Sequence, residues 1–207
     1  DVDAVLTTRE LAKMIKEAGL EFAKLQDSVF DNPFGDAATG AAVIFGATGG
    51  VMEAALRTAV WKLTGEKDGT PIEFTEVRGV DGIKEATYNV AGMDVKVAVA
   101  SGTKNAKELL TKVQNGEEKV DFIEIMACPG GCVGGGGQPF KDGEEKAAER
   151  AKKLYGLDKV NNLRFSHENP AVQLTYKEFL GKPLSHRAHE LLHTDLKEWD
   201  LDMLQST

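Results

Sequence analysis

Residues 124–139 read Glu-Ile-Met-Ala-Cys-Pro-Gly-Gly-Cys-Val-Gly-Gly-Gly-Gly-Gln-Pro. The proline and glycines cannot continue a helix, so an irregular loop is predicted after the apolar run that ends at Met126. Cys128 and Cys132, the two cysteines of the chain, both lie on this loop. Two thiolates among free backbone N–H groups suit an iron–sulfur cluster, because those donors stabilise its negative charge. A local disulfide and two idle thiols are the simpler alternatives.

Strand and helix patterns alternate around this loop. Short β-branched or apolar runs predict strands over residues 2–6, 72–77, 85–90, 95–100 and 122–126. Helical periodicity is found over residues 9–18, 51–63, 103–113, 143–155, 171–180 and 185–193. Such alternation predicts an α/β fold with a mainly parallel, four-stranded sheet flanked by helices. Ligands of these sheets bind at the carboxyl ends of strands, where both glycine-rich loops are expected.

The second glycine-rich loop, Gly46-Ala-Thr-Gly-Gly50, follows an apolar run and precedes a predicted helix. It fits neither the dinucleotide-binding pattern nor the Walker pattern, which needs a lysine followed by serine or threonine. Free N–H groups at the start of a helix can bind an anion. Close packing of a helix on a strand is the alternative explanation for these glycines.

Length and charge limit the kind of protein. The 207 residues suffice for one large domain or two small ones. The 33 acidic residues outnumber the 25 basic ones, giving a net charge of −8. Binding to nucleic acid is not expected, because it depends on many basic contacts to phosphate. The uncharged residues 37–52 fall short of the ~20 that cross a bilayer, so no membrane association is expected.

His189-Glu190-Leu-Leu-His193 matches the zinc-peptidase pattern, in which two histidines one helical turn apart hold the metal and the glutamate acts as base. Only 14 residues follow His193, which leaves no room for the helix that normally brings a third ligand. A packed or half-exposed terminal helix is therefore favoured, and a zinc peptidase is the remote alternative.

Several segments together resemble the FeFe (iron-only) hydrogenases. Residues 124–139 are similar to the last of that family's three cysteine motifs, and residues 39–57 (TGAAVIFGATGGVMEAALR) to another hallmark segment. Further similar stretches are Val77-Arg-Gly79, Gly82-Ile-Lys-Glu-Ala86, Ser166-His-Glu-Asn-Pro170 and residues 178–193. The resemblance extends over nearly the whole chain. It implies that residues 1–194 form the carboxyl-terminal lobe of the large-subunit-like domain, with residues 195–207 as a terminal extension.

The resemblance also implies a cofactor and an activity. In the family a four-iron, four-sulfide cluster (4Fe-4S) is joined through a cysteine sulfur to a di-iron subcluster with carbon monoxide, cyanide and a bridging amine dithiolate. Together they form the H-cluster, which reversibly reduces protons to dihydrogen. Carried over, Cys128 ligates the four-iron cluster, while Cys132 ligates it and bridges to the two irons. The pocket around the two irons would be lined by Phe45, Gly46, Ala47, Thr48, Gly49, Met126 and Gly134.

The family's other two cysteine motifs, Thr-Ser-Cys-Cys-Pro and Met-Pro-Cys, are absent from this sequence. We therefore expect the other two cluster cysteines on a companion chain or on an amino-terminal half, this chain being a natural subunit, a cleaved product or an engineered fragment. A ferredoxin-like electron donor and the cytoplasm of an anaerobe are also expected. The alternative is a non-catalytic, hydrogenase-like interaction or sensory module without a complete cofactor.

Overall fold

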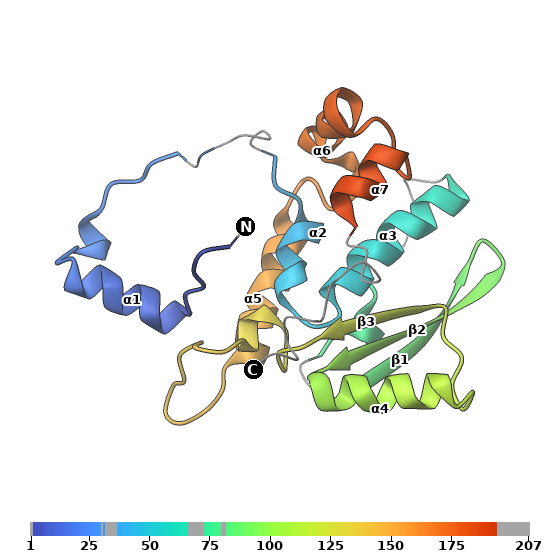
Figure 1. Ribbon diagram of the computed structural model, residues 1–207, viewed down its shortest axis with the longest axis horizontal. Coiled ribbons are helices and arrows are strands. Elements are labelled where there is room, and N and C mark those ends of the chain that lie inside the picture. Colours follow the sequence, from blue (N-terminus) through green and yellow to red (C-terminus); the bar gives the residue numbers. More distant parts are fainter. Residues whose placement is uncertain (1, 30, 32–36, 66–72, 80–81, 194–207) are drawn as a thin grey trace, which may run out of the picture. The chain divides into compact units, whose positions relative to one another are not determined.

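The computed structural model describes residues 2–29, 31, 37–65, 73–79 and 82–193. Its α-helices and strands, drawn in Figure 1, are α1 (Thr8–Glu17), α2 (Gly40–Val43), α3 (Gly50–Thr64), β1 (Ile83–Val90), β2 (Met93–Ser101), α4 (Thr103–Gln114), β3 (Phe122–Met126), α5 (Ala147–Val160), α6 (Pro170–Thr175) and α7 (His186–Leu192). Short 3-10 turns occupy Phe22–Lys24, Ile44–Gly46, Thr75–Val77, Cys132–Gly134 and Ser166–Glu168, and a π-helix Tyr176–Leu180 follows α6.

The chain divides into two compact units. The larger comprises residues 1–31 and 38–166, and the smaller comprises residues 32–37 and 167–207. Both glycine-rich loops belong to the larger unit, and the His-Glu-Leu-Leu-His segment belongs to the smaller. The predicted terminal extension, residues 195–207, lies outside the described residues. None of the described helices is both long enough and apolar enough to cross a membrane.

An α/β fold is confirmed, but the described part of the chain forms a three-stranded mixed sheet instead of a mainly parallel, four-stranded one. The strand order is β1-β2-β3. β1 and β2 are antiparallel, from Ile83↔Ala100 to Val90↔Met93, and β2 and β3 are parallel. The antiparallel pairing follows from a two-residue turn, Ala91-Gly92, in which both residues have positive φ. Two positive φ values in a two-residue turn match the twist of a β-hairpin, so the turn joins neighbouring antiparallel strands. A parallel pair would need a longer crossover connection.

β2 lies at the centre of the sheet and is buried on both faces. Val97 and Val99 face the core that α3 covers with Met52, Leu56 and Val60. Ala98 and Ala100 face the opposite core, where α4 contributes Ala106 and Leu109. Figure 1 shows α3 and α4 on opposite sides of the sheet within the larger unit. The unbroken apolar run of β2 is thus explained by two covered faces.

Two predicted strands are wrong. Residues 2–6 form no strand among the described residues, and they are exposed. Of the predicted strand over 72–77, Ile72 lies outside the described residues and Thr75–Val77 forms a 3-10 turn. Val77 is nevertheless fully buried, because the turn itself packs into the core beneath α3. The apolar and β-branched residues of this run therefore predicted burial correctly but secondary structure incorrectly.

Candidate metal centre at two glycine-rich loops

The cysteine loop leaves the carboxyl end of β3 and turns twice within a few residues. The Gly131 N–H donates to the Cys128 carbonyl at 3.0 Å, and the Gly135 N–H donates to the Cys132 carbonyl at 3.1 Å. Gly130 and Gly131 have φ of +82° and +89°, a backbone that side-chain-bearing residues rarely adopt. Both thiols are free and exposed. The glycines thus curl the backbone so that two sulfurs four residues apart are accessible on one loop.

The first glycine-rich loop lies directly against the cysteine loop. The Thr48 N–H donates to the Gly130 carbonyl at 3.1 Å. A Cβ at Gly131 would lie 2.8 Å from the Gly46 carbonyl oxygen and 2.8 Å from the Thr48 nitrogen. Only glycine permits this approach. The two sequence segments that were predicted to hold and line a cofactor are therefore brought together by the fold, although they are more than 80 residues apart.

The predicted lining residues differ in exposure. Ala47, Thr48 and Gly49 are buried, Gly46 is half-buried, and the Phe45 side chain is 44% exposed. Met126 and Gly134 are half-buried. A Cβ at Gly134 would lie 2.2 Å from the Pro129 carbonyl oxygen, so Gly134 serves to close the loop. Only the cysteine loop follows a strand, because the residues before Gly46 form the helical turns α2 and Ile44–Gly46 instead of the expected strand end.

Ser101 and Glu124 connect the two loops to the sheet, and sequence reasoning missed both roles. The Gly130 N–H donates to the Ser101 Oγ at 2.8 Å, and the Thr48 hydroxyl donates to the same oxygen at 3.4 Å. Glu124, in the middle of β3, accepts hydrogen bonds from the N–H groups of Gly49 and Met52, each at 2.6 Å. A glutamate within an otherwise apolar strand, Phe-Ile-Glu-Ile-Met, was the available signal.

The Glu124 carboxylate occupies the anion-binding position at the start of α3. It is a built-in anion at the positive end of the helix, and it takes the N–H groups of Gly49 and Met52. Burial raises the pKa of Glu124, and the hydrogen bonds from Gly49 and Met52 oppose that rise. These two N–H groups are therefore not available to an external ligand.

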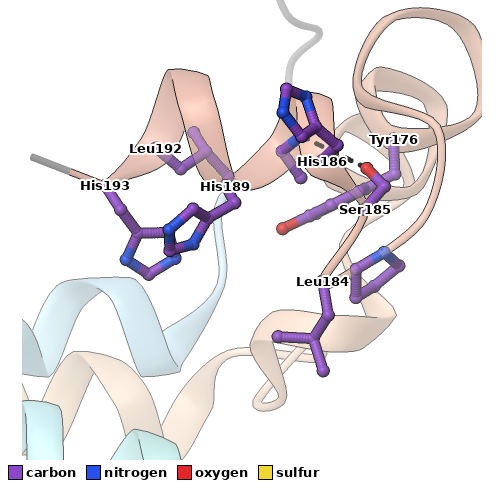
Figure 2. A pocket seen from close by; sticks show the side chains of 9 residues that line it. Tyr176, Leu184, Ser185, His186, His189, Leu192 and His193 are labelled. Carbon is purple, nitrogen blue, oxygen red and sulfur yellow. Dashed lines mark hydrogen bonds between the residues drawn. The ribbon is translucent and has the colours of Figure 1, made fainter. Parts of the chain in front are cut away.

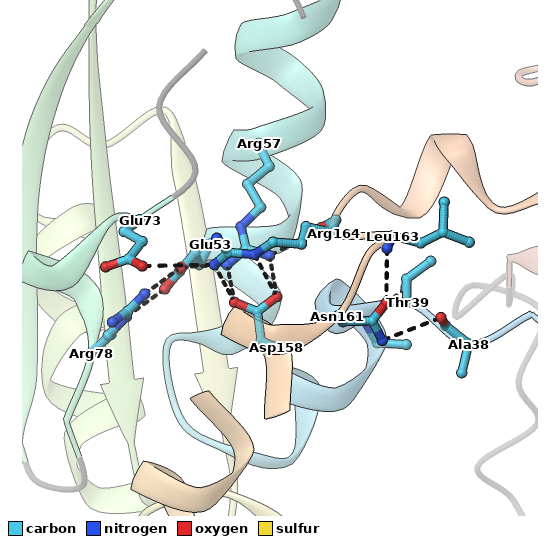
Figure 3. Close-up of polar contacts among 11 residues, drawn as sticks. Ala38, Thr39, Glu53, Arg57, Glu73, Arg78, Asp158, Asn161, Leu163 and Arg164 are labelled. Carbon is cyan, nitrogen blue, oxygen red and sulfur yellow. Dashed lines mark hydrogen bonds and ion pairs between the residues drawn. The ribbon is translucent and has the colours of Figure 1, made fainter. Parts of the chain in front are cut away.

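A buried ion network holds α3 against α5 (Figure 3). The two terminal nitrogens of the Arg57 guanidinium, Nη1 and Nη2, each donate to the Asp158 carboxylate at 2.8 Å, and Nη2 also donates to Glu53 at 2.7 Å. Glu53 accepts from Arg78, and Asp158 accepts from Arg164. Burial would raise the pKa of Asp158, but its hydrogen bonds with Arg57 and Arg164 outweigh burial and lower it. This network was not predicted, although Glu53 and Arg57 stand out in an apolar helix.

The histidines of the smaller unit do not form a zinc site (Figure 2). The rings of His189 and His193 are stacked, with centroids 4.8 Å apart and an interplanar angle of 28°. Imidazole lone pairs lie in the ring plane, so stacked rings do not direct two nitrogens at one ion. His186 is turned away from them and faces Glu190 at 3.8 Å, both side chains being exposed. The helix α7 that carries them lines a pocket of about 360 Å³.

Family models match most of the chain. Residues 1–136 match the iron only hydrogenase large subunit, C-terminal domain, and residues 144–199 match the iron hydrogenase small subunit. The chain belongs to the iron-only hydrogenase family. The predicted family membership is thus confirmed.

Similar proteins include enzymes and a protein of another kind. The NADP-reducing hydrogenase subunit HndD of Solidesulfovibrio fructosivorans is 53% identical over 94% of this chain and 33% of its own length. The apo FeFe hydrogenase HydA1 of Chlamydomonas reinhardtii has a TM-score of 0.73 at 45% identity, over 93% of this chain and 54% of that one. Cytosolic iron-sulfur assembly component 3 of Bos taurus is 31% identical over 94% of this chain and 41% of its own length. The chain thus spans roughly a third to a half of the proteins it matches.

The donor set of this chain fits part of an iron–sulfur site. Two free thiols on a glycine-rich loop are the ligand type that such clusters take, and they usually take four. A Cβ at Gly135 would lie 3.2 Å from the Cys132 carbonyl oxygen and 3.9 Å from the Cys128 sulfur, so this glycine lies beside the Cys128 thiol. Among the residues that the structure describes, no three histidine, cysteine or acidic side chains are grouped to hold a metal. Cys128 and Cys132 can therefore anchor a cluster but not enclose it.

Proposed function

We propose that this chain is the part of an FeFe hydrogenase that supplies two cysteine ligands and one wall of the H-cluster pocket. The reaction would be the reversible reduction of two protons by two electrons to dihydrogen. The observation that supports it best is the packing of the Phe45–Gly49 loop against the cysteine loop through Thr48 and Gly131. The 53% identity to a hydrogenase subunit supports the same activity.

The residues would divide the work as follows. The Cys128 thiolate would ligate the four-iron cluster, and the Cys132 thiolate would ligate it and bridge to the di-iron subcluster. Phe45, Gly46, Ala47, Thr48, Met126 and Gly134 would line the two-iron pocket, while Gly49 would act through its backbone shape because Glu124 takes its N–H. When bound, the cofactor supplies the electron transfer and the proton reduction, and the protein supplies ligation, shape and exclusion of water.

Further polypeptide would complete the site. Two exposed thiols leave two ligands of a four-cysteine cluster to a companion chain or an amino-terminal half. The helix α1 contains no buried residue, and its apolar side chains Leu11 and Met14 are 49% and 51% exposed, which suits a face that a partner covers. We include in the proposal a ferredoxin-like electron donor and a place in the cytoplasm of an anaerobe, where thiols stay reduced.

A role in iron–sulfur cluster assembly without hydrogen chemistry is the second candidate. Its support is the 31% identity to cytosolic iron-sulfur assembly component 3 across 94% of this chain. A protein of that class would need Cys128 and Cys132 for an iron–sulfur cluster but not for the di-iron subcluster. The two candidates therefore agree on the cluster cysteines and differ in the second site.

Dihydrogen production tests the proposal. The assembled protein, purified without oxygen together with any companion chain, is assayed with a reduced dye as electron source. The proposal predicts dihydrogen from the wild type, none from Cys132→Ser, and wild-type rates from the control His189→Ala. Iron and sulfide without dihydrogen production in the wild type would contradict the proposal and favour the assembly role.

A further inference from the structure

Glu124 is a buried carboxylate that has no role in the proposed hydrogenase chemistry. Its side chain is 6% exposed, and each of its two oxygens accepts one backbone hydrogen bond at 2.6 Å. Hydrogen bonds to an ionised acceptor are short and about twice as strong as neutral ones. Taking a carboxylate out of water is nevertheless costly, so its presence among the apolar residues of β3 calls for an explanation.

The position of Glu124 relates it to both loops. It lies in β3, two residues before Met126 and four before Cys128, so its backbone is continuous with the cysteine loop. Its two donors, Gly49 and Met52, are at the end of the Phe45–Gly49 loop and in the first turn of α3. One buried side chain thus joins the strand that leads to the cysteines with the loop that faces them.

A second residue, Ser101, also restricts the movement of the two loops. Ser101, at the end of the neighbouring strand β2, accepts from the Gly130 N–H and from the Thr48 hydroxyl. Ser101 therefore meets the same two loops one strand away, at Gly130 and Thr48. With both contacts in place, the separation of the two loops is fixed by hydrogen bonds from adjacent strands of one sheet.

We propose that Glu124 is a positioning residue for the cofactor pocket: its carboxylate sets the distance between the Phe45–Gly49 loop and the cysteine loop. The inference rests on the proposed function for its catalytic meaning, since these two loops are the ones proposed to line the di-iron subcluster. Its geometric part concerns residues of this chain alone. Loss of one oxygen acceptor would release either Gly49 or Met52 and let the first loop move relative to the cysteines.

Glu124→Gln is the most informative variant. The side chain keeps its length, but its amide nitrogen cannot accept, so one of the two N–H groups loses its partner. Glu124→Asp keeps the charge but is one methylene too short to reach both donors. Glu108→Gln is the matched control, because Glu108 lies on the surface of α4 and pairs with Lys112 at 2.9 Å.

The first measurement uses the full protein without cofactor. Amide exchange followed by NMR should be about ten-fold faster at Gly49 or Met52 in Glu124→Gln, with unchanged exchange in β1 and α4. Alkylation rates of Cys128 and Cys132 should also differ from the wild type, because the adjoining loop has moved. Wild-type exchange at both amides together with wild-type alkylation rates would overturn the proposal. If Glu124→Gln does not fold, the same two readouts in Glu124→Asp decide it.

The second measurement uses the loaded protein and separates this inference from the proposed function. The infrared bands of carbon monoxide and cyanide on the two irons should shift in Glu124→Gln and stay in place in Glu108→Gln. Unshifted bands in Glu124→Gln would overturn the positioning role. Absence of these bands from the wild type would count against the hydrogenase function, and the exchange and alkylation measurements would then decide the loop geometry alone.

Discussion

Arg57 and Asp158 are the most consequential buried pair outside the two loops. Arg57 is fully buried, and its guanidinium also donates to the Arg164 carbonyl at 3.0 Å. Gly40 lets α2 approach this pair, because a Cβ there would lie 2.1 Å from an Asp158 carboxylate oxygen. A network of this kind is satisfied only when each member is present, so single substitutions leave an uncompensated charge.

Asp158→Asn is expected to lower the free energy of unfolding by about 3–5 kcal/mol, the usual cost of breaking a buried ion pair from one side. Urea unfolding followed by circular dichroism measures the change. Lys13→Ala, which removes an exposed pair with Glu17 on α1, should change the same quantity by less than about 1 kcal/mol. Equal effects of the two substitutions would show that the buried network adds nothing.

The same carboxylate predicts how stability depends on pH. The pKa of Asp158 is lowered in the folded protein, so the folded state favours its charged form. Its stabilising contribution is therefore complete above its unfolded pKa of about 3.9 and is lost as the pH falls towards the folded value. Unfolding midpoints measured between pH 6 and pH 3 should fall more steeply for the wild type than for Asp158→Asn. Parallel curves would contradict this assignment.

At the scale of elements, local signals predicted the helices and long-range contacts decided the rest. The helix predicted over residues 9–18 is observed as α1 over Thr8–Glu17, and it begins at a capping box in which Thr7 and Glu10 exchange side-chain and backbone hydrogen bonds. The resemblance implied that the two loops lie near each other, but the hydrogen bond from Thr48 to Gly130 could not be predicted, because it depends on contacts across the fold. Glu124 was visible as a charged residue in an apolar strand, but its donors, Gly49 and Met52, are more than 70 residues away.

The glycines of the cysteine loop offer a matched pair of substitutions. Gly131→Ala would place a Cβ against the first loop at a φ of +89°, whereas a Cβ at Gly136 meets nothing within 4 Å. Gly131→Ala should therefore reduce cluster iron in the assembled protein several-fold and cost about 1–3 kcal/mol of stability. Gly136→Ala should leave both near wild type. Iron content and thermal unfolding are measured on the same samples. Equal values for the two variants would disprove the close approach of the two loops at Gly131.

At the scale of the whole molecule, the described chain has a well-formed core around β2 but an uncovered helix α1. α1 presents Leu11 and Met14 without burying any residue. Apolar stripes of this kind are normally covered by another surface. The proteins it matches are two to three times as long, which provides polypeptide to cover it.

Leu11→Glu tests whether α1 is covered in the assembled protein. A charge in a covered apolar contact should reduce recovery of the assembled protein or of its companion chain several-fold, because a buried unpaired charge is costly. Lys13→Glu, on the same helix at a largely exposed position, is the control and should have little effect. Size-exclusion chromatography of both variants gives the answer, and intact assembly in Leu11→Glu would refute a covered α1.

Iron and sulfide analysis of the anaerobically purified, assembled protein tests the central claim most directly. If Cys128 and Cys132 hold the cluster, the wild type should contain roughly six irons per chain, from a four-iron and a two-iron site. Cys132→Ser should then lose most of that iron, while His189→Ala keeps it. Iron that persists in Cys132→Ser, or a wild type without iron and sulfide, would contradict the account.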